Sequence, residues 1–527
     1  MDSIAPIDWA ICGCYLGVVI GLGLYFSNKQ KDNDDFFLAG RNMHWLPVGL
    51  SLFATTFSSN SFVGLPAEGA FGDYHQLLAI FFIPFVVIPI TCIWFIPFYK
   101  GFGFVSLYEY LERRFTRKIR LMASLIFMLY SAGWMGTMLL AVSRILDVVL
   151  ETDSILQTLA VIGVVGLLAT IYTAIGGVKA VIWTDTIQAF ALCGGMVFLL
   201  GLLIWKIDGG VTAYLAVGSA EGKFEMLSLE GGLKEHNLYS ACAYGFFVYM
   251  GGQLASYGAF QRYVTVDSVS SARRALIIKG GFTLVSCTLF FMVGTALFVF
   301  YQQSHPEIFE TYLSEPRKHD QLLPHFVINY AGGFGVTGLI LAGLFAAAMS
   351  SLDSGINSMT ATLVTDWFHG REFGTSINRW LTAGFGLGVT LIACLLALIN
   401  SPVFKILLSI AGATLGLLLA ILMLGMLIRR VNSAGVLAGA IAGLCVFFLI
   451  RFGLPLLGNE TLESLGPVAD LKSNTWWDGL LTTVPAVVVG IGASFLAPPP
   501  RPQQLEGLLL RQMAAEVPRD LGPPETD

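Results

Sequence analysis

The sequence predicts an all-α polytopic membrane protein with about 13 transmembrane helices. Of its 527 residues, 55% are hydrophobic and only 12% are charged, and the mean hydropathy is +0.72. Soluble globular proteins carry about 25% charged residues, so the composition excludes that class. In addition, apolar runs of about 20 residues, long enough to cross about 30 Å of hydrocarbon, recur along the whole chain.

Each of these runs is expected to form one membrane-spanning helix. They cover approximately residues 7–27, 46–70, 76–99, 119–150, 157–175, 180–206, 238–257, 275–302, 335–367, 377–399, 402–428, 433–455 and 476–497. The N-terminus lacks the basic region of a cleaved signal peptide, so the first run is expected to remain in the protein. The tail after residue 497 begins with a proline run, which a helix interior does not tolerate.

The distribution of Lys and Arg predicts the orientation in the lipid bilayer. Cytoplasmic connections hold most basic residues, and with the N-terminus outside the inner connections hold 21 of the 30. Arg262 and Lys279 are counted in the inner connection between the seventh and eighth runs. We therefore expect a multi-pass protein of the cell membrane (plasma or bacterial inner membrane), with its N-terminus outside, its C-terminus cytoplasmic and one chain as the functional unit.

Two classes of function are not expected. No basic patch large enough for nucleic acid stands out in the chain. The residues of the apolar runs also do not assemble a nucleophile, a base and an orienting partner, so no enzyme activity is expected.

Residues 46–70, LPVGLSLFATTFSSNSFVGLPAEGA, form a membrane run that is interrupted by SSNS and then by Gly64 and Pro66. A break frees backbone carbonyls, which membrane proteins tolerate only inside protein or beside a water-lined cavity. In transporters, paired broken helices hold the coupling ion and the substrate. A counterpart is expected near 238–257, at Gly251 and Gly252; the alternative is a kinked helix without a ligand.

Residues 346–366, AAAMSSLDSGINSMTATLVTD, place a line of hydroxyl groups inside another run. Ala347, Ser350, Ser351 and Ser354 share one helical face, and Asp353 lies beside them. An ionisable group inside a membrane is costly and indicates function, although hydroxyls also bond back to their own helix. Facing the carbonyls of the broken helix, these oxygens would suit a hard cation such as sodium.

Several segments together resemble the sodium/solute symporter family, which includes bacterial sugar, proline and sialic acid symporters and human glucose, monocarboxylate, multivitamin and iodide cotransporters. The segments are FFLAGRNMHWLPVGLSLFATTFS, VSLYEYLERRF, YTAIGGVKAVIWTDTIQ, FQRY and AAAMSSLDSGINS, in the order typical of the family. The resemblance implies a leucine-transporter-type fold of two inverted five-helix repeats, with discontinuous first and sixth core helices.

This resemblance also implies a division of the chain. It consists of a leading helix with its cytoplasmic loop (1–45), the first repeat (46–206), an extracellular connection (207–237), the second repeat (238–430), two trailing helices (431–497) and a cytoplasmic tail (498–527).

The family's sodium sites can be carried over residue by residue. The resemblance implies a main Na⁺ site made of the carbonyls of Ala54, Phe57 and Ala347 and the hydroxyls of Ser350 and Ser351. A possible second site consists of Asp185, Ser350, Ser351 and Ser354. Asp353 stands where members with that site have a serine, so its carboxylate is either a further ligand or the partner of a neighbouring hydroxyl or lysine.

The substrate is less well defined. The positions that contact a hexose in sugar symporters correspond to Ser61, Ile80 and Leu408, which largely lack the side chains that hydrogen-bond sugar hydroxyls. The PAE triplet at Pro66 to Glu68 and the YEYLERRF run are closest to the anion-carrying branch. Candidates to line the substrate pocket, or else to serve in packing, are Thr56, Ser61, Tyr249 and Tyr257.

The sequence therefore predicts sodium-coupled symport of a small organic anion, such as a monocarboxylate, a vitamin or sialic acid, by alternating access. A sodium symporter of sugars or other neutral solutes is the first alternative. A proton-coupled carrier or uniporter of the same fold, with Asp185 or Asp353 as the proton site, is the second.

Overall fold

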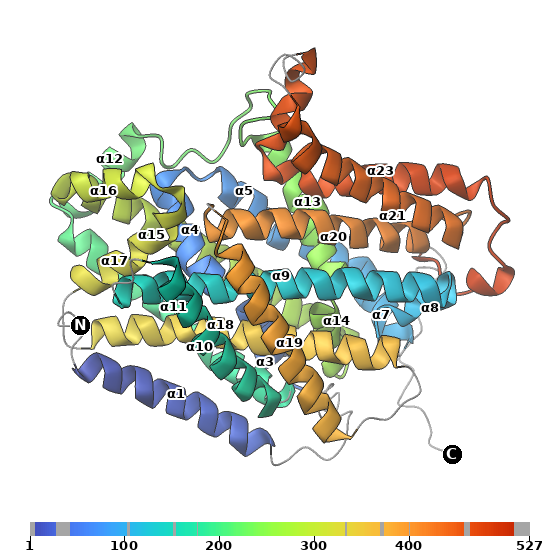
Figure 1. Cartoon of the computed structure of the whole chain (residues 1–527), viewed down its shortest axis with the longest axis horizontal. Helices are drawn as coiled ribbons and strands as arrows, with labels where there is room; N and C mark the ends of the chain where they lie inside the picture. Colours follow the sequence, from blue (N-terminus) through green and yellow to red (C-terminus); the bar gives the residue numbers. More distant parts are fainter. Residues whose placement is uncertain are drawn as a thin grey trace.

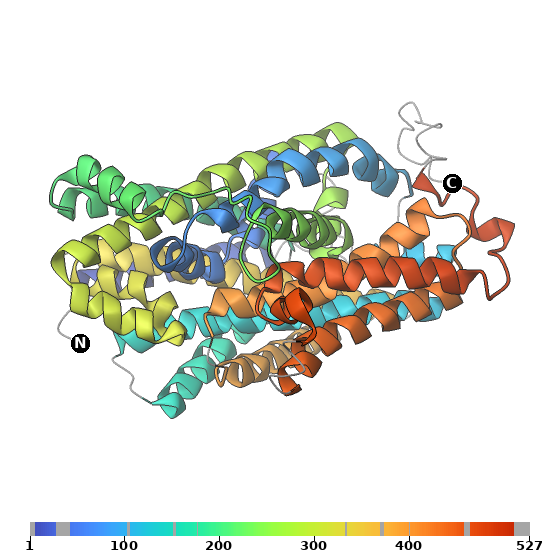
Figure 2. The ribbon, with the colours of Figure 1, turned by 90° about the horizontal axis from the view of Figure 1, so that it is seen from above.

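The computed structural model describes residues 6–27, 43–102, 106–150, 154–175, 178–331, 335–368, 374–399, 401–457 and 464–510. Within these ranges the chain forms a helical bundle without any β-strand, and its one extended pairing is an isolated bridge between Met43 and Val266. Most of the long helices run along the longest axis of the molecule (Figure 1), as the view from above also shows (Figure 2).

The first half of the chain contains six of the predicted spans. They are α1 (Pro6–Ser27), the interrupted pair α3 (Trp45–Thr56) and α4 (Ser59–Phe71), the continuous run from α5 (His75–Phe82) through η2 (Ile83–Val87), α6 (Ile88–Ile90) and η3 (Thr91–Phe95) to α7 (Ile96–Phe102), then α9 (Arg117–Val149), α10 (Ile155–Ile175) and α11 (Val178–Lys206). The short helix α8 (Glu109–Arg114) precedes α9.

The second half contains the other seven. They are the pair α13 (Leu238–Ala255) and α14 (Tyr257–Thr265), α15 (Val269–Ser304), α18 (Val336–Thr362) with η5 (Leu363–Trp367), α19 (Thr375–Leu396), α20 (Val403–Leu427), α21 (Ser433–Phe448) with η6 (Leu449–Gly453) and η7 (Leu454–Leu456), and α23 (Asp478–Ser494). The connections form α12 (Gly210–Ala220), α16 (Pro306–Ser314), η4 (Pro316–Gln321), α17 (Leu322–Asn329), η8 (Gly466–Lys472), η9 (Thr475–Trp477) and η10 (Pro502–Gln504).

Every predicted apolar run is mainly helical where the structure describes it, with breaks inside the runs 46–70 and 238–257. In the described residues, eight helices are each long and apolar enough to cross a membrane alone. The remaining runs correspond to shorter, interrupted or more polar helices, such as α3 with α4 and α18. The chain is therefore a multi-pass membrane protein, as predicted.

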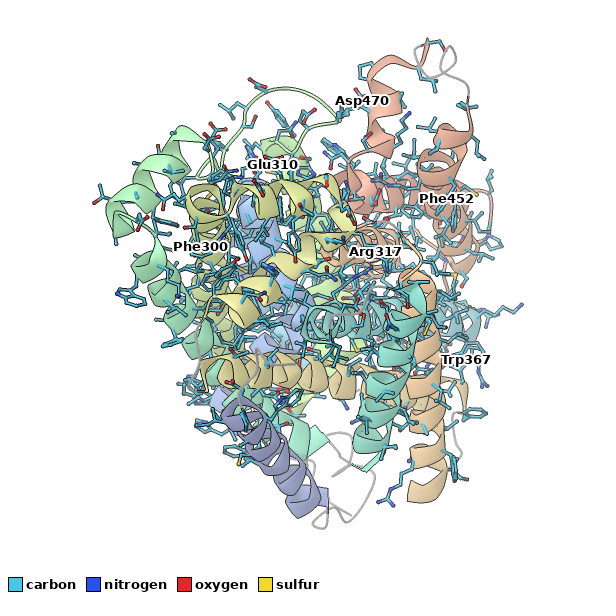
Figure 3. The ribbon with its side chains drawn as sticks, turned by 60° about the vertical axis from the view of Figure 1, so that its left-hand side comes forward. Phe300, Glu310, Arg317, Trp367, Phe452 and Asp470 are labelled. Carbon is cyan, nitrogen blue, oxygen red and sulfur yellow. The ribbon has the colours of Figure 1, made fainter. Side chains whose placement is uncertain are left out.

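The connecting helices separate the two ends of the bundle. The short helices α12, α16 and α17 lie at the same end as the start of α1, and α8 lies at the opposite end (Figures 1 and 2). Side chains fill the space between the helices in Figure 3, where Glu310 on α16 and Arg317 on η4 lie away from Trp367, the last residue of η5. The helices of the two long connections, α12 in one and α16 and α17 in the other, thus lie at one end of the bundle.

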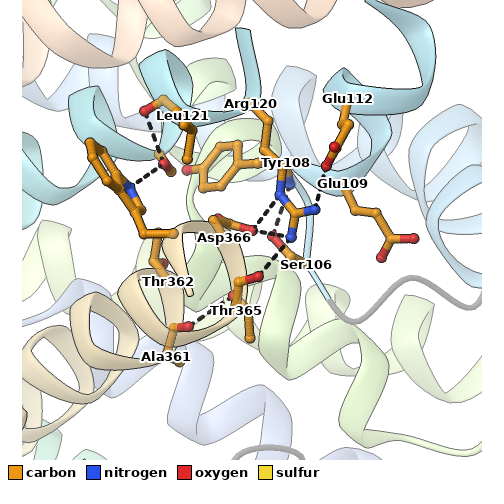
Figure 4. A network of polar contacts seen from close by, with 12 residues as sticks. Ser106, Tyr108, Glu109, Glu112, Arg120, Leu121, Ala361, Thr362, Thr365 and Asp366 are labelled. Carbon is orange, nitrogen blue, oxygen red and sulfur yellow. Dashed lines mark hydrogen bonds and ion pairs between the residues drawn. The ribbon is translucent and has the colours of Figure 1, made fainter. Parts of the chain in front are cut away.

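A network of charges holds η5, the segment that follows the C-terminal end of α18. The Arg120 guanidinium on α9 contacts the Glu112 carboxylate at 2.7 Å and the Asp366 carboxylate at 2.6 Å, and it also donates to the carbonyl of Thr365 at 3.0 Å (Figure 4). Arg120 and Asp366 are buried. These contacts fix the end of α18 against α8 and α9, and so position the polar face of α18 within the bundle.

The break in the sixth core helix lies at Ser256, between α13 and α14, rather than at the glycine pair in the middle of the predicted run. Gly251 and Gly252 are both helical. Gly251 serves close packing, because a Cβ atom there would lie 2.3 Å from the Leu415 carbonyl oxygen on α20. The glycine pair therefore marks a helix crossing, and the break follows one turn later.

Gly251→Ala is expected to lower the free energy of unfolding by about 1–3 kcal/mol, the usual cost of forcing extra atoms into a packed core. Gly252→Ala is the matched control, since its Cβ would meet only the flexible end of Leu415 at 3.4 Å. Reversible unfolding in mixed micelles measures both variants. Equal stability of the two would show that α20 moves away from α13 at little cost.

Candidate functional site

The first core helix is broken at Phe57 and Ser58. The amide of Phe57 donates to the Phe53 carbonyl at 2.9 Å, which ends α3, and the amide of Phe62 donates to the Ser58 carbonyl at 3.0 Å, which begins α4. No backbone N–H of the described residues donates to the carbonyls of Ala54 or Phe57. Both residues are buried. Because no backbone N–H of the described residues uses these carbonyl oxygens, they can serve as ligands of a bound ion.

The polar face of α18 lies against this break. The Ser351 hydroxyl is fully buried and lies 3.5 Å from the carbonyl oxygen of Thr55. Helix α18 also runs through Ala347, Ser350 and Asp353, whose side chains lie outside the described residues. Of the predicted main sodium site, the structure thus brings Ser351 to the broken segment that contains Ala54 and Phe57.

The predicted second sodium site contains an arginine. The Arg262 guanidinium on α14 lies 3.3 Å from the Asp185 carboxylate on α11 and donates to the Ser354 hydroxyl on α18 at 2.8 Å. Ser51 on α3 donates to Asp185 at 2.6 Å and accepts from Arg262 at 2.9 Å. Asp185 and Ser354 therefore both contact the guanidinium of Arg262, so a side-chain cation occupies the predicted second site.

The count of basic residues assigned Arg262 to a cytoplasmic connection, but the structure places it elsewhere. It is only 4% exposed and lies on α14, the second half of the broken helix. The FQRY segment that contains it was noted in the sequence, but its helix of nine residues is too short to form an apolar run. Hydropathy alone could not place it inside the bundle.

A cavity opens beside the first break. It is lined by residues from α3, α4, α5, α9, α13, α14, α15, α18 and α20, and its lining includes three of the four predicted substrate residues: Thr56, Ser61 and Tyr249. Tyr257 does not line it, because its ring packs against Phe127 and Phe260. Ile80 and Leu408 line the cavity as well.

The cavity also has polar residues that were not singled out from the sequence. Lys279 on α15 donates from its ammonium nitrogen to the Gln253 side-chain oxygen at 2.7 Å, and both residues are buried. Lys279 had been assigned to an inner connection, but α15 begins at Val269, ten residues before it. Ser268, whose hydroxyl accepts from the Ser271 amide at 3.1 Å, was the N-cap signal that predicts this earlier start.

The second helix break differs from the first in its hydrogen bonds. The Tyr99 hydroxyl donates to the Leu254 carbonyl at 2.7 Å, and the Tyr108 hydroxyl donates to the Ala255 carbonyl at 2.8 Å. These two tyrosines hold carbonyls that the end of α13 would otherwise leave without a partner. The first break is thus the better cation site of the two.

Outside the membrane-spanning segments, Asp320 of η4 connects the second long connection to α20. Its carboxylate accepts from the amide of Val403, the first residue of α20, at 2.7 Å. Burial raises the pKa of Asp320 to about 6, although this hydrogen bond opposes the shift. The side chain therefore acquires its charge only as the pH rises through about 6.

Comparisons with known proteins agree with this geometry. A profile of the "Sodium:solute symporter family" matches residues 36–443. The chain is 30% identical to the sodium/sialic acid symporter NanT of Aliivibrio fischeri over 499 residues, which cover 93% of each chain. It is also 29% identical to the human sodium/iodide cotransporter, over 85% of this chain and 70% of the relative.

A solved structure of a Na⁺-coupled sialic acid symporter, in a substrate-bound outward-open state, aligns with a TM-score of 0.81 at 28% identity. It covers 94% of this chain and 99% of that one. The leucine-transporter-type fold with two discontinuous core helices is thereby confirmed, and so is sodium as the coupling ion. This chain belongs to the sodium:solute symporter family and is a sodium-coupled solute symporter, not an enzyme.

Proposed function

We propose that this symporter imports a small organic anion together with sodium, and that Ala54, Phe57, Ala347, Ser350 and Ser351 form its main sodium site. The observation that carries the proposal is the position of the Ser351 hydroxyl against the first break, 3.5 Å from the Thr55 carbonyl. Oxygen ligands from two helices that are distant in the sequence are what a hard cation requires.

The coupling follows from where the site lies. Sodium bound between the break and α18 would bridge the first and second repeats, which we place at residues 46–206 and 238–430. Such a bridge favours one conformation only if the ion binds the two conformations unequally. Inward movement of sodium releases about 2.3 kcal/mol per charge for each 100 mV, which supplies the energy for uptake. Loss of the ion to the inside would then open the bridge and release the solute.

An anionic substrate fits the cavity better than a sugar. Ile80 and Leu408, at positions where sugar symporters are expected to hydrogen-bond a hexose, line the cavity with apolar side chains. A site that binds several hydroxyls needs matching polar groups. The sialic acid symporter and the iodide cotransporter are, by their names, carriers of anions, and we propose the same substrate class for this chain.

The contacts of Arg262 affect two further proposals, a second sodium site and a proton site at Asp185. Because Arg262 contacts both Asp185 and Ser354, we propose a second sodium there only for conformations in which Arg262 has moved away. The same contact occupies the Asp185 carboxylate, so a proton carrier at Asp185 would also require Arg262 to move away. We further propose that a single chain transports, with its N-terminus outside and its C-terminus cytoplasmic.

Uptake into proteoliposomes tests the proposed function. The labelled probes are N-acetylneuraminate, lactate, biotin and iodide, with glucose as the neutral comparison, each driven by an inward sodium gradient or by choline in its place. We expect one or more anions, and not glucose, to accumulate in sodium only. Uptake that persists without sodium and follows a pH gradient would instead establish the proton-coupled alternative.

A further inference from the structure

The charges around the cavity are not balanced. Two cationic side chains line it, Arg262 and Lys279, and no carboxylate of the described residues does. Arg262 is neutralised from outside the lining by Asp185, at 3.3 Å. Among the described residues, Lys279 contacts only the neutral side chain of Gln253 within hydrogen-bond distance. The cavity wall therefore carries one positive charge that lacks a carboxylate partner.

The protein satisfies the ammonium group of Lys279 only in part. An ammonium group has three donors, and one of them is used at 2.7 Å by the Gln253 side-chain oxygen. The Gln253 amide nitrogen hydrogen-bonds to the Tyr263 hydroxyl, so its oxygen points to Lys279. Lys279 is 6% exposed, and a buried charge is costly unless it is paired. An anionic ligand would supply that pair.

A second donor lies one helical turn along α15. Thr283 is four residues after Lys279, which places both side chains on one face of the helix, and both line the cavity. The Thr283 hydroxyl is buried and has no hydrogen-bond partner in the part of the chain that the structure describes. A buried hydroxyl that lacks a partner is destabilising, and a ligand oxygen in the cavity would supply that partner.

We infer that Lys279 and Thr283 form the subsite for the anionic group of the transported solute, with the ammonium as its counter-charge and the hydroxyl as a further donor. This inference rests on the proposed function and names the part of the cavity that recognises the charge. Charged hydrogen bonds are about twice as strong as neutral ones, so Lys279 should decide between an anion and its neutral analogue.

The test measures binding to the purified full-length protein in sodium. The probes are lactate against lactamide, biotin against biotinamide, and N-acetylneuraminate against its methyl ester, so that each pair differs in the charge. For the carboxylate that binds, Lys279→Met is expected to weaken the affinity by at least about tenfold. The affinity for its neutral analogue is expected to fall by less than about twofold. Lys279→Arg should retain most of the affinity, because it keeps the charge.

Two further variants separate this role from packing. Thr283→Val keeps the shape and removes one donor, so it should weaken carboxylate binding by about threefold to tenfold. Lys318→Met is the matched control, since Lys318 lies on η4, is 43% exposed and pairs only with Glu315 at 3.0 Å. Circular dichroism and the elution volume in size-exclusion chromatography report whether each variant is folded.

Three outcomes are decisive. Equal carboxylate affinity of wild type and Lys279→Met would overturn the subsite and leave the proposed function intact. Equal losses for the acid and its neutral analogue would do the same, because the lysine would then act through packing. A wild-type protein that binds none of the carboxylates in sodium would overturn both. If Lys279→Met does not fold, the carboxylate affinities of Lys279→Arg and Thr283→Val are compared with that of wild type. Unchanged affinity in Thr283→Val would then overturn the subsite.

Discussion

Arg262→Met is expected to lower the free energy of unfolding by about 3–5 kcal/mol, which is the usual effect of removing one partner of a buried ion pair. Asp185 is completely buried, and without Arg262 its carboxylate would lose the guanidinium and keep neutral partners such as the Ser51 hydroxyl. Arg262 also holds α14 to α3, α11 and α18 through Ser51, Asp185 and Ser354. The loss is therefore both electrostatic and structural.

A double-mutant cycle identifies the cause of this loss. Asp185→Asn combined with Arg262→Met removes both charges, and it should be more stable than Arg262→Met alone, since no uncompensated carboxylate remains. Arg274→Met is the control, because Arg274 is exposed on the same stretch of chain. Unfolding in mixed micelles measures the four proteins of the cycle and the control variant. A double variant whose loss equals the sum of the two single losses would show that the pair is not coupled.

Sodium extends this prediction to the proposed second ion site. In Arg262→Met the Asp185 carboxylate and the Ser354 hydroxyl lose the guanidinium that contacts them both. A small cation can then take its place, so replacing choline by sodium should raise the apparent unfolding temperature of this variant more than that of wild type. An equal response of the two proteins would argue against sodium at this position.

Ser350→Ala combined with Ser351→Ala is expected to raise the sodium concentration for half-maximal uptake by at least about tenfold, equivalent to about 1.4 kcal/mol. The proposed main site would lose two of its five oxygen ligands and keep only backbone carbonyls. Substrate affinity measured at saturating sodium should change much less, because the hydroxyls touch the ion and not the solute. Each single variant is expected to show a smaller shift in the same direction.

Thr362→Ala is the matched control for the serine pair. Thr362 lies on the same helix and is buried, but its hydroxyl donates to the Ser358 carbonyl of its own helix at 2.8 Å. Its sodium dependence should therefore equal that of wild type. If the serine double variant also behaves as wild type does, the sodium ion is bound elsewhere and the proposed main site is wrong.

The break in the first core helix was predictable because its signal is local. The SSNS segment interrupts an apolar run, and polar groups within such a run require protein partners or water. The break in the sixth core helix was placed wrongly. Its carbonyls are held by Tyr99 and Tyr108, 155 and 147 residues away in the sequence, so no local pattern marks it.

The sequence by itself determined the helical spans, the broken first core helix and the hydroxyl line on α18. These follow from bilayer thickness and from the demand of each backbone group for a partner, which are properties of single segments. Only the tertiary structure decided that Arg262 lies between Asp185 and Ser354 and that Lys279 lines the cavity. A basic side chain at the end of an apolar run looks the same whether it faces the cytoplasm or the bundle. The choice depends on the partners that distant helices bring to it.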